Sequence, residues 1–185
     1  LLNFTLKKSI VSILFIYAFA LNVNVNNQKS YIEYTGYHPL HSWVGVSSKI
    51  ESTISCQDTT FSSCDVSIDV QSDSFDSQNI NRDSNVIDVI EAYTFPTINF
   101  KSTSYSITKQ KKDTLFIDLV GDLFFHGIKK SVISQLILVK TQNNIYGEAF
   151  FQIVPTDFGI ILPTLLFISI YDQIDIKANL KGNFK

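Results

Sequence analysis

Apolar and polar residues alternate along several separate stretches of the chain. In the stretch 48–56, Ile50, Ile54 and Cys56 fall on one face, and polar residues such as Lys49 fall on the other. A period of two residues is typical of a β-strand that buries one face. The same alternation recurs in the stretches 64–70, 98–101, 115–125, 132–138, 149–153 and 174–180.

The alternating stretches predict an all-β fold of about eight antiparallel strands, and the many Val, Ile, Phe, Ser and Thr residues favour the same class. Closing such a sheet into a barrel removes its exposed edges, so we expect an eight-stranded antiparallel barrel. A sandwich of two sheets is the alternative fold. A barrel of this size is either filled by its own side chains or holds one small ligand, and the pattern does not choose between these.

Two stretches interrupt the alternation and predict short helices. Apolar residues in the stretch 85–92 recur at a spacing closer to that of a helix, with Asp83 or Ser84 as the candidate N-cap. The stretch 165–170 follows an apolar loop between two prolines and predicts a second short helix.

The first 20 residues resemble a secretion signal. Lys7 and Lys8 precede an apolar run at 10–19, and Ala18-Phe19-Ala20 fits a cleavage site of small residues. The run is shorter than the ~20 residues that a membrane-spanning helix needs, so a retained anchor is the weaker alternative. We therefore expect a secreted or periplasmic protein with a signal peptide at 1–20, a flexible lead-in at 21–30 and one barrel domain at 31–185.

The composition excludes some functions and favours others. Charged residues make up 17% of the chain and its formal net charge is −2, so a nucleic-acid partner is not expected. The 15 phenylalanines exceed what a tight barrel core needs, and apolar walls with few polar groups are typical of a site for a long hydrophobic ligand. The sequence has no catalytic-triad motif and no phosphate-binding loop, so we expect neither an enzyme nor a cofactor.

Cys56 and Cys64, the two cysteines, stand at the facing ends of a predicted hairpin. Secretion would place them where disulfides form, and closing so short a loop stabilises a fold by about 2–3 kcal/mol in the chain-entropy model. We predict a Cys56–Cys64 disulfide. The alternative is two reduced core cysteines, if the strand register holds them too far apart.

The histidines and the arginine are the other candidates for specific chemistry. His38 and His41 have a spacing that suggests a metal pair, but two loop histidines fix neither a geometry nor a third ligand, so no metal site is expected. His126 is expected to be a turn or packing residue. Arg82 could form a surface ion pair with Asp83, or it could bind an anionic head group through two hydrogen bonds.

Several motifs resemble those of a known family. Residues 95–102 read Phe-Pro-x-Ile-x-Phe-x-Ser, and residues 121–132 read Gly-Asp-Leu-x-x-His-Gly-x-x-Lys-x-Val. Together with His38-Pro-Leu-His-Ser-Trp-x-Gly45, Arg82-Asp83-Ser84-Asn85 and Asp157-Phe158-Gly159, and in this order, they resemble the YceI-like family of lipocalin-like, polyisoprenoid-binding proteins. The similarity covers the chain from about Tyr31 to Leu180.

The resemblance implies an extended lipocalin-like barrel with one or two short helices and a polyisoprenoid or isoprenoid-quinone chain in an apolar tube. It implies a ligand-binding role for Arg82 and Asn85 at the mouth, and for Trp43, Phe100, Phe124 and Phe158 in the wall, although the alternation puts Phe124 on the outer face. We therefore expect a non-enzymatic lipid-binding protein, able to form a homodimer and without a stable membrane span after signal cleavage. The alternative is a filled barrel that serves as a structural or protein-interaction module.

Overall fold

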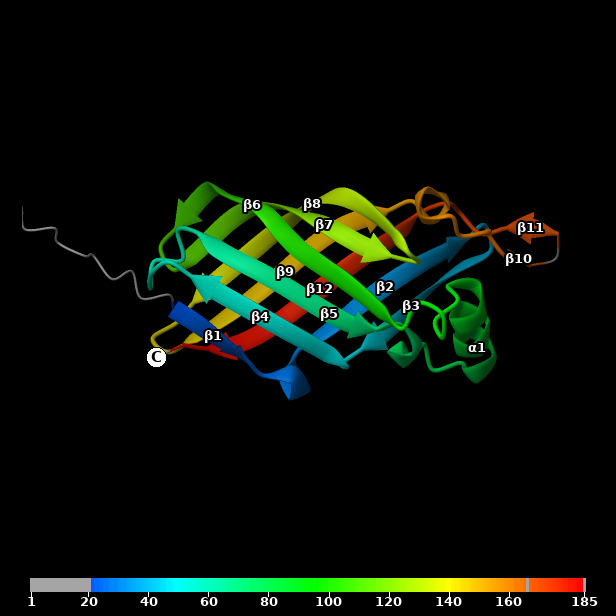
Figure 1. The fold of residues 1–185 in the computed structure, drawn as a ribbon, viewed down its shortest axis with the longest axis horizontal. Coiled ribbons are helices and arrows are strands. Elements are labelled where there is room, and N and C mark those ends of the chain that lie inside the picture. Colours follow the sequence, from blue (N-terminus) through cyan, green and yellow to red (C-terminus); the bar gives the residue numbers. More distant parts are fainter. Residues whose placement is uncertain (1–20, 166, 185) are drawn as a thin grey trace, which may run out of the picture.

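Eight antiparallel strands close into one elongated barrel (Figure 1). The computed structural model describes residues 21–165 and 167–184, and the predicted signal peptide lies outside them. The predicted barrel is confirmed, and the sandwich alternative is excluded because the last strand pairs back onto the first. In barrel order the strands are β1 (Leu21–Val25), β4 (Ile50–Cys56), β5 (Cys64–Gln71), β6 (Thr97–Lys111), β7 (Thr114–Phe125), β8 (Ile128–Lys140), β9 (Asn144–Ile153) and β12 (Ile174–Asn183).

The strand β1 closes the ring. Asn24 lies opposite Asn183 of β12, and Leu21 lies opposite Cys56 of β4. The sequence predicts a flexible lead-in at 21–30, and the structure corrects this, because Leu21–Val25 belongs to the barrel wall. Its apolar residues do alternate, but the residues between them are asparagines, which strands disfavour, and this obscures the pattern.

One end of the barrel carries the elements that are not part of the ring (Figure 1). There, β2 (Tyr31–His38) pairs with β12 and with β3 (His41–Ser47) and continues the wall. The helix α1 (Ile80–Val89) and a small hairpin of β10 (Thr164–Leu165) and β11 (Ile168–Ser169) lie at the same end. Three short 3-10 turns complete the described elements, at Asn27–Lys29, Ser72–Ser74 and Pro155–Phe158.

Both predicted helices need correction. α1 begins at Ile80 and not near Asn85, and its N-cap is Asn79, whose side-chain Oδ1 accepts the backbone N–H of Arg82 at 3.1 Å. The polar first turn of α1 lacks the apolar spacing that marks the rest. The described residues of the stretch 165–170, which are 165 and 167–170, contain β11 and no helix, since so short an apolar run fits a hairpin as well as a helical turn. In the part of the chain that the structure describes, no helix has the length and apolar character needed to cross a membrane.

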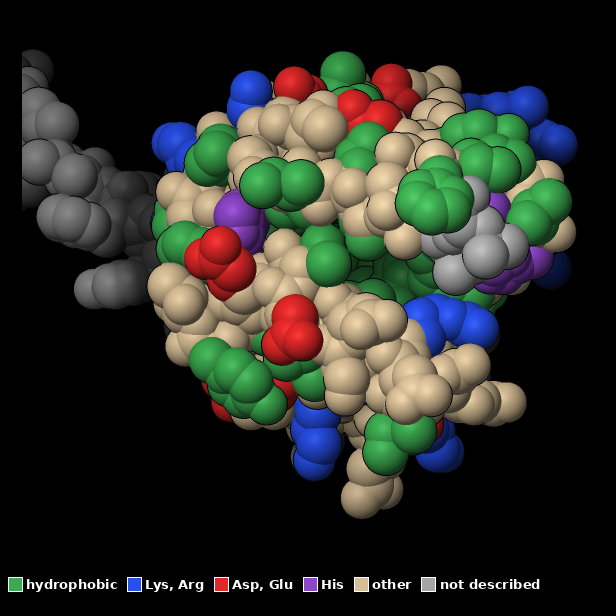
Figure 2. All heavy atoms as spheres, turned by 90° about the vertical axis from the view of Figure 1, so that its right-hand side faces the viewer, with side chains coloured by type: hydrophobic (Ala, Val, Ile, Leu, Met, Phe, Trp, Pro, Cys, Tyr) green, Lys and Arg blue, Asp and Glu red, His purple; other side chains and the backbone are tan. Residues whose placement is uncertain are grey.

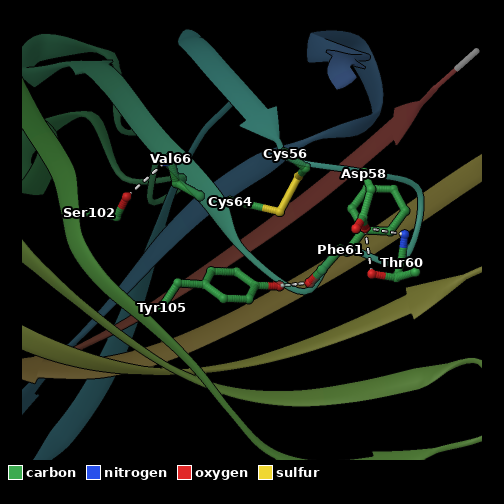
Figure 3. The surroundings of a disulfide bond; sticks show 8 residues. All are labelled: Cys56, Asp58, Thr60, Phe61, Cys64, Val66, Ser102 and Tyr105. Carbon is green, nitrogen blue, oxygen red and sulfur yellow. Dashed lines mark hydrogen bonds between the residues drawn. A yellow bond between two sulfur atoms is a disulfide. The ribbon is translucent and has the colours of Figure 1, made fainter. Parts of the chain in front are cut away.

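The opposite end of the barrel is closed by a cross-linked hairpin (Figure 3). Cys56 and Cys64 face each other across β4 and β5 and form the predicted disulfide. The loop between them folds inward, and the Phe61 side chain is fully buried. The Tyr105 hydroxyl donates a hydrogen bond to the Phe61 carbonyl at 2.9 Å, and burial raises the pKa of Tyr105. This end is therefore packed shut.

Candidate ligand-binding cavity

A cavity of about 500 Å³ opens at the end of the barrel that carries α1 and the β10–β11 hairpin. Figure 2 faces this end and shows a hollow with hydrophobic side chains in its depth. Ligand sites for small molecules have volumes of roughly 300–1,000 Å³, so the space is large enough for a ligand. The barrel is therefore hollow at this end, which removes the premise of the filled-barrel alternative.

The inward-facing residues of the strands make the wall of the cavity. Because side chains alternate across a strand, one parity of each strand points inward and the wall is continuous. The wall residues from the strands are nearly all apolar: Ile32, Ile68, Val70, Ile98, Phe100, Leu119, Leu123, Phe125, Ala149, Phe151, Ile153, Ile174, Ile176 and Ala178. From α1 and the segment after it, Val86, Val89 and Ile90 complete the apolar lining.

Gly121 has a structural role in this wall. It lies opposite Ser102 on the neighbouring strand β6, and the Phe100 ring packs over it. A Cβ atom at position 121 would lie 2.4 Å from the Phe100 ring, which is too close for any side chain. The glycine therefore sets the position of Phe100, one of the residues expected in the cavity.

Four small or aliphatic side chains form the floor of the cavity. Ile68, Leu119, Ala149 and Ala178 line both the large cavity and a second, deeper space of about 60 Å³. Ala149 and Ala178 lie directly opposite each other on β9 and β12. The size of these two residues therefore limits how far a ligand can reach toward the closed end.

At the mouth of the cavity, three neighbouring aromatic rings are followed by a cation. His38 and His41 lie with their ring centroids 5.4 Å apart, and His41 and Trp43 lie 5.7 Å apart. The guanidinium carbon of Arg82 lies over the Trp43 ring, 5.7 Å from its centroid. This arrangement brings β2, β3 and α1 together, and all four side chains line the cavity.

The Arg82–Asp83 pair that the sequence allows is absent. The carboxylate of Asp83 turns away, and its Oδ1 accepts hydrogen bonds from the backbone N–H and hydroxyl of Ser77 at 3.1 and 2.6 Å. Within residues 21–165 and 167–184, no carboxylate lies within 4.0 Å of the Arg82 guanidinium. The Arg82 guanidinium therefore lines the mouth of the cavity without a carboxylate partner among the described residues.

The buried His38 has a defined tautomer. Its Nδ1 accepts the backbone N–H of Leu40 at 3.2 Å, so a neutral His38 carries its proton on Nε2. That Nε2 is buried and has no hydrogen-bond partner in the described part of the chain. The indole Nε1 of Trp43 is buried and also without a hydrogen bond there. Both groups belong to cavity-lining residues, and unsatisfied buried donors of this kind are uncommon.

The structure places four of the six predicted site residues around the cavity: Trp43, Arg82, Asn85 and Phe100. It does not place the other two there. Phe124 is 43% exposed on the outer face of β7, as the alternation indicates. Phe158 is buried beneath the wall and packs against Phe125, with ring centroids 5.5 Å apart. The Asp157-Phe158-Gly159 motif does not reveal whether the Phe158 ring faces the cavity or packs behind its wall.

The mouth histidines are the main functional candidates that sequence reasoning did not assign to the site. Both belong to a motif that the sequence shows, but the motif does not reveal that their strand ends line the cavity. They form no metal site with other described residues, because no group of three or more His, Cys, Asp or Glu side chains there is placed to hold an ion. His126 is a turn residue, as expected: it and Gly127 have φ values of 49° and 72°, and they join β7 to β8.

Comparisons with known proteins agree with this geometry. A model of the YceI-like domain matches residues 24–182. Among solved structures, BcnA of Burkholderia cenocepacia is 17% identical over 85% of this chain and 99% of its own, with a TM-score of 0.72. A polyisoprenoid-binding domain of Saccharophagus degradans is 10% identical over 90% of this chain and all of its own, with a TM-score of 0.67. The YceI protein of Campylobacter jejuni is 16% identical over 100% of this chain and 99% of its own, with a TM-score of 0.60. The search of curated protein sequences found no match.

Proposed function

The chain belongs to the YceI-like domain family, and from this premise we propose that it binds an isoprenoid-type lipid, with the apolar tail inside the barrel. The observation that carries the proposal is the cavity itself: it is ligand-sized, open at one end and walled by apolar side chains. The Saccharophagus degradans domain with the same fold is described as polyisoprenoid-binding. That description supports a branched, unsaturated lipid as the ligand class.

The physical basis of binding would be the removal of the tail from water. Each Å² of apolar surface that is buried contributes about 25 cal/mol before the costs of association. A long tail can bury far more such surface than a short one, so the affinity should rise with the number of isoprene units that fit above the Ala149–Ala178 floor. The proposed function is binding without catalysis.

The proposed location is a secreted or periplasmic compartment. The positively charged and apolar pattern of residues 1–20 supports this location, and the Cys56–Cys64 disulfide fits an oxidising compartment. In such a compartment, a barrel whose apolar cavity opens at one end would shield a water-insoluble lipid from the solvent.

Trp43 provides a direct test of binding, since it is the only tryptophan of the chain and lines the cavity mouth. We expect a saturable change of its fluorescence on addition of geranylgeraniol, with a stoichiometry of one per chain. Prenol, which has the same alcohol and a much shorter tail, should bind far more weakly. Absence of saturable binding of geranylgeraniol to a protein first freed of lipid would contradict the proposal.

A further inference from the structure

We infer that the β10–β11 hairpin is a membrane-docking element, which inserts its tip into a lipid bilayer and turns the mouth of the cavity toward the membrane. Such docking goes beyond the proposed binding of a lipid inside the barrel. It does not depend on that binding, because it uses the outer rim of the barrel and side chains that face away from the cavity.

The segment that contains the hairpin carries no charge. Residues 158–171 include no Asp, Glu, Lys, Arg or His, and no other stretch after residue 20 continues as long without one. The cavity explains the inward-facing residues of this segment, since Ile160, Leu162 and Ile170 line its wall. The cavity does not explain the outward-facing residues, of which Ile161 is 87% exposed and Phe167 is fully exposed.

Further exposed apolar side chains lie beside the hairpin. The backbone N–H of Tyr171 donates a hydrogen bond to the Tyr37 carbonyl at 2.8 Å, and this bond ties the base of the hairpin to β2. Leu40, in the turn that follows β2, and Tyr171 are both more than half exposed. Figure 2 shows hydrophobic side chains on the rim of the hollow as well as in its depth. Exposed apolar groups that gather from separate segments in this way indicate an interaction surface.

The shape of the hairpin favours a bilayer over a protein as the partner. At the open end, β10 and β11 extend beyond the rest of the described chain (Figure 1). Each of the two strands has only two residues, so the tip is far smaller than the roughly 800 Å² that each partner contributes to a specific protein interface. A fluid bilayer adapts to a convex tip, and Phe, Leu and Tyr are typical of segments that bury side chains at the boundary between head groups and acyl chains.

The backbone of the hairpin also suits an apolar environment. Polar backbone groups need partners when a segment enters the hydrocarbon of a bilayer. Thr164 pairs with Ser169 within the hairpin, and at its base the Ile170 N–H donates a hydrogen bond to the Pro163 carbonyl at 3.2 Å. The hairpin therefore already pairs much of its backbone, and a shallow insertion of its tip leaves these bonds in place.

The absence of charge predicts how docking responds to lipid composition and salt. Because residues 158–171 have no cation and the chain has a net charge of −2, docking should need no anionic lipid. We expect the full chain to bind phosphatidylcholine vesicles saturably in a flotation assay. The affinity should change by less than about twofold between roughly 0.05 and 0.5 M NaCl, since salt screens charges but not apolar contacts.

Three variants locate the contact with the bilayer. Phe167→Ser should reduce the affinity for phosphatidylcholine vesicles by about tenfold, because an aromatic side chain no longer leaves water on docking. Ile161→Ser should also reduce it, by about fivefold. Ile133→Ser removes an exposed aliphatic side chain from the middle of β8 and should leave the affinity unchanged. Every variant carries the same residues 1–20, so differences among them report the substituted positions.

A fluorescent label tests whether the tip itself enters the bilayer. Ser169→Cys places a thiol at an exposed position on β11, and Ser106→Cys places one at an exposed position on β6, next to the Tyr105 that contacts the closed end. Each thiol is coupled to a nitrobenzoxadiazole group, whose emission moves to shorter wavelength in an apolar environment. We expect phosphatidylcholine vesicles to cause this shift at position 169 and not at position 106.

The outcomes separate docking from ligand binding. Equal vesicle affinities of Phe167→Ser and Ile133→Ser, or a label at position 169 whose emission does not change with vesicles, would overturn the docking inference. Vesicle binding that requires phosphatidylglycerol and disappears in salt would overturn it as well. So would self-association of the protein in sedimentation that Phe167→Ser abolishes, since the hairpin would then contact a second copy of the chain. Docking that persists in a protein unable to bind geranylgeraniol would overturn lipid binding alone.

Discussion

Single residues in the floor of the barrel determine how deep a ligand can lie. Ala149 and Ala178 oppose each other across β9 and β12 and separate the large cavity from the small deeper one. A larger side chain at either position would occupy space that is empty, so it should alter ligand binding more than it alters folding. This differs from overpacking a filled core, which costs about 1–3 kcal/mol.

We predict that Ala149→Leu lowers the affinity for geranylgeraniol by about tenfold, because the bulkier floor excludes the last part of the tail at ~0.8 kcal/mol per CH₂ group. The midpoint of thermal unfolding should stay close to that of the unmodified protein. Ser131→Leu adds the same side chain to an exposed position on β8 and should leave binding unchanged. Equal effects of the two substitutions on binding would contradict the assigned floor.

A second residue-scale prediction concerns pH. The Tyr37 hydroxyl on β2 donates a hydrogen bond to Asp175 Oδ2 on β12 at 2.6 Å, and this bond lowers the pKa of Asp175 below its ordinary value. The ionised form is therefore favoured in the folded protein. The contribution to stability is present above the unfolded-state pKa near ~4 and is lost as the pH falls through the lower folded-state pKa.

Tyr37→Phe removes that hydrogen bond. The variant should unfold at a lower urea concentration than the unmodified protein at pH 7, and the difference should shrink as the pH falls below about 4. Tyr31→Phe makes the same change elsewhere on β2 and serves as the control. A difference between Tyr37→Phe and the unmodified protein that stays constant from pH 7 to pH 2 would contradict the assignment to Asp175.

At the scale of elements, one end of the barrel contributes mainly to stability and the other end contributes mainly to ligand binding. The β4–β5 hairpin closes one end with its disulfide and the buried Phe61, whereas α1, the β2–β3 turn and the segment 155–164 surround the open end. Stability and binding should therefore respond to changes at different ends.

Removal of the disulfide tests this division. We expect Cys56→Ser together with Cys64→Ser to reduce the free energy of unfolding by about 2–3 kcal/mol, as the chain-entropy model gives for so short a loop. The affinity for geranylgeraniol should stay within about twofold, because the bridge lies beyond the floor of the cavity. Urea unfolding and the Trp43 fluorescence titration measure the two quantities on the same sample. Loss of binding in a variant that is still folded would contradict the division.

A substitution at the N-cap of α1 tests whether the helix at the open end can be destabilised without affecting the barrel strands. Asn79→Ala removes the acceptor for the Arg82 backbone N–H and should destabilise the helix by about 1 kcal/mol. Hydrogen exchange of the α1 backbone amides should become about fivefold faster, while that of the barrel strands stays unchanged. Ser84→Ala, which lies within the same helix and is not its cap, should not accelerate exchange.

Elements with a strong alternation could be predicted from the sequence, and weakly patterned ones could not. The strands around Ile117, Ala149 and Ile176 alternate clearly, so the barrel follows from them. The asparagines that alternate with the apolar residues of β1 obscure its strand pattern. The first turn of α1 is polar and lacks the apolar spacing that would predict its start. Trp43, Arg82 and Phe100 could be assigned to the cavity from family motifs. The His38 contribution could not, because its unpaired Nε2 depends on a hydrogen bond to Leu40 that only the folded turn creates.

At the scale of the whole molecule, the fold is a tube with one closed and one open end. The closed end anchors the ring of strands through β1, the disulfide and the Phe61 plug. The open end combines an apolar wall with a single cation and buried donors at the mouth. Such a tube suits an amphiphile that enters tail first and keeps its head at the opening.

Native mass spectrometry of the purified protein, followed by extraction and identification of any bound lipid, tests the central claim most directly. The account predicts one isoprenoid-type lipid per chain in the protein as isolated, or uptake of one geranylgeranyl lipid per chain after addition, and a smaller bound fraction in Ala149→Leu at the same lipid concentration. A protein that is isolated empty and also takes up no isoprenoid would contradict the claim that this cavity is a lipid site.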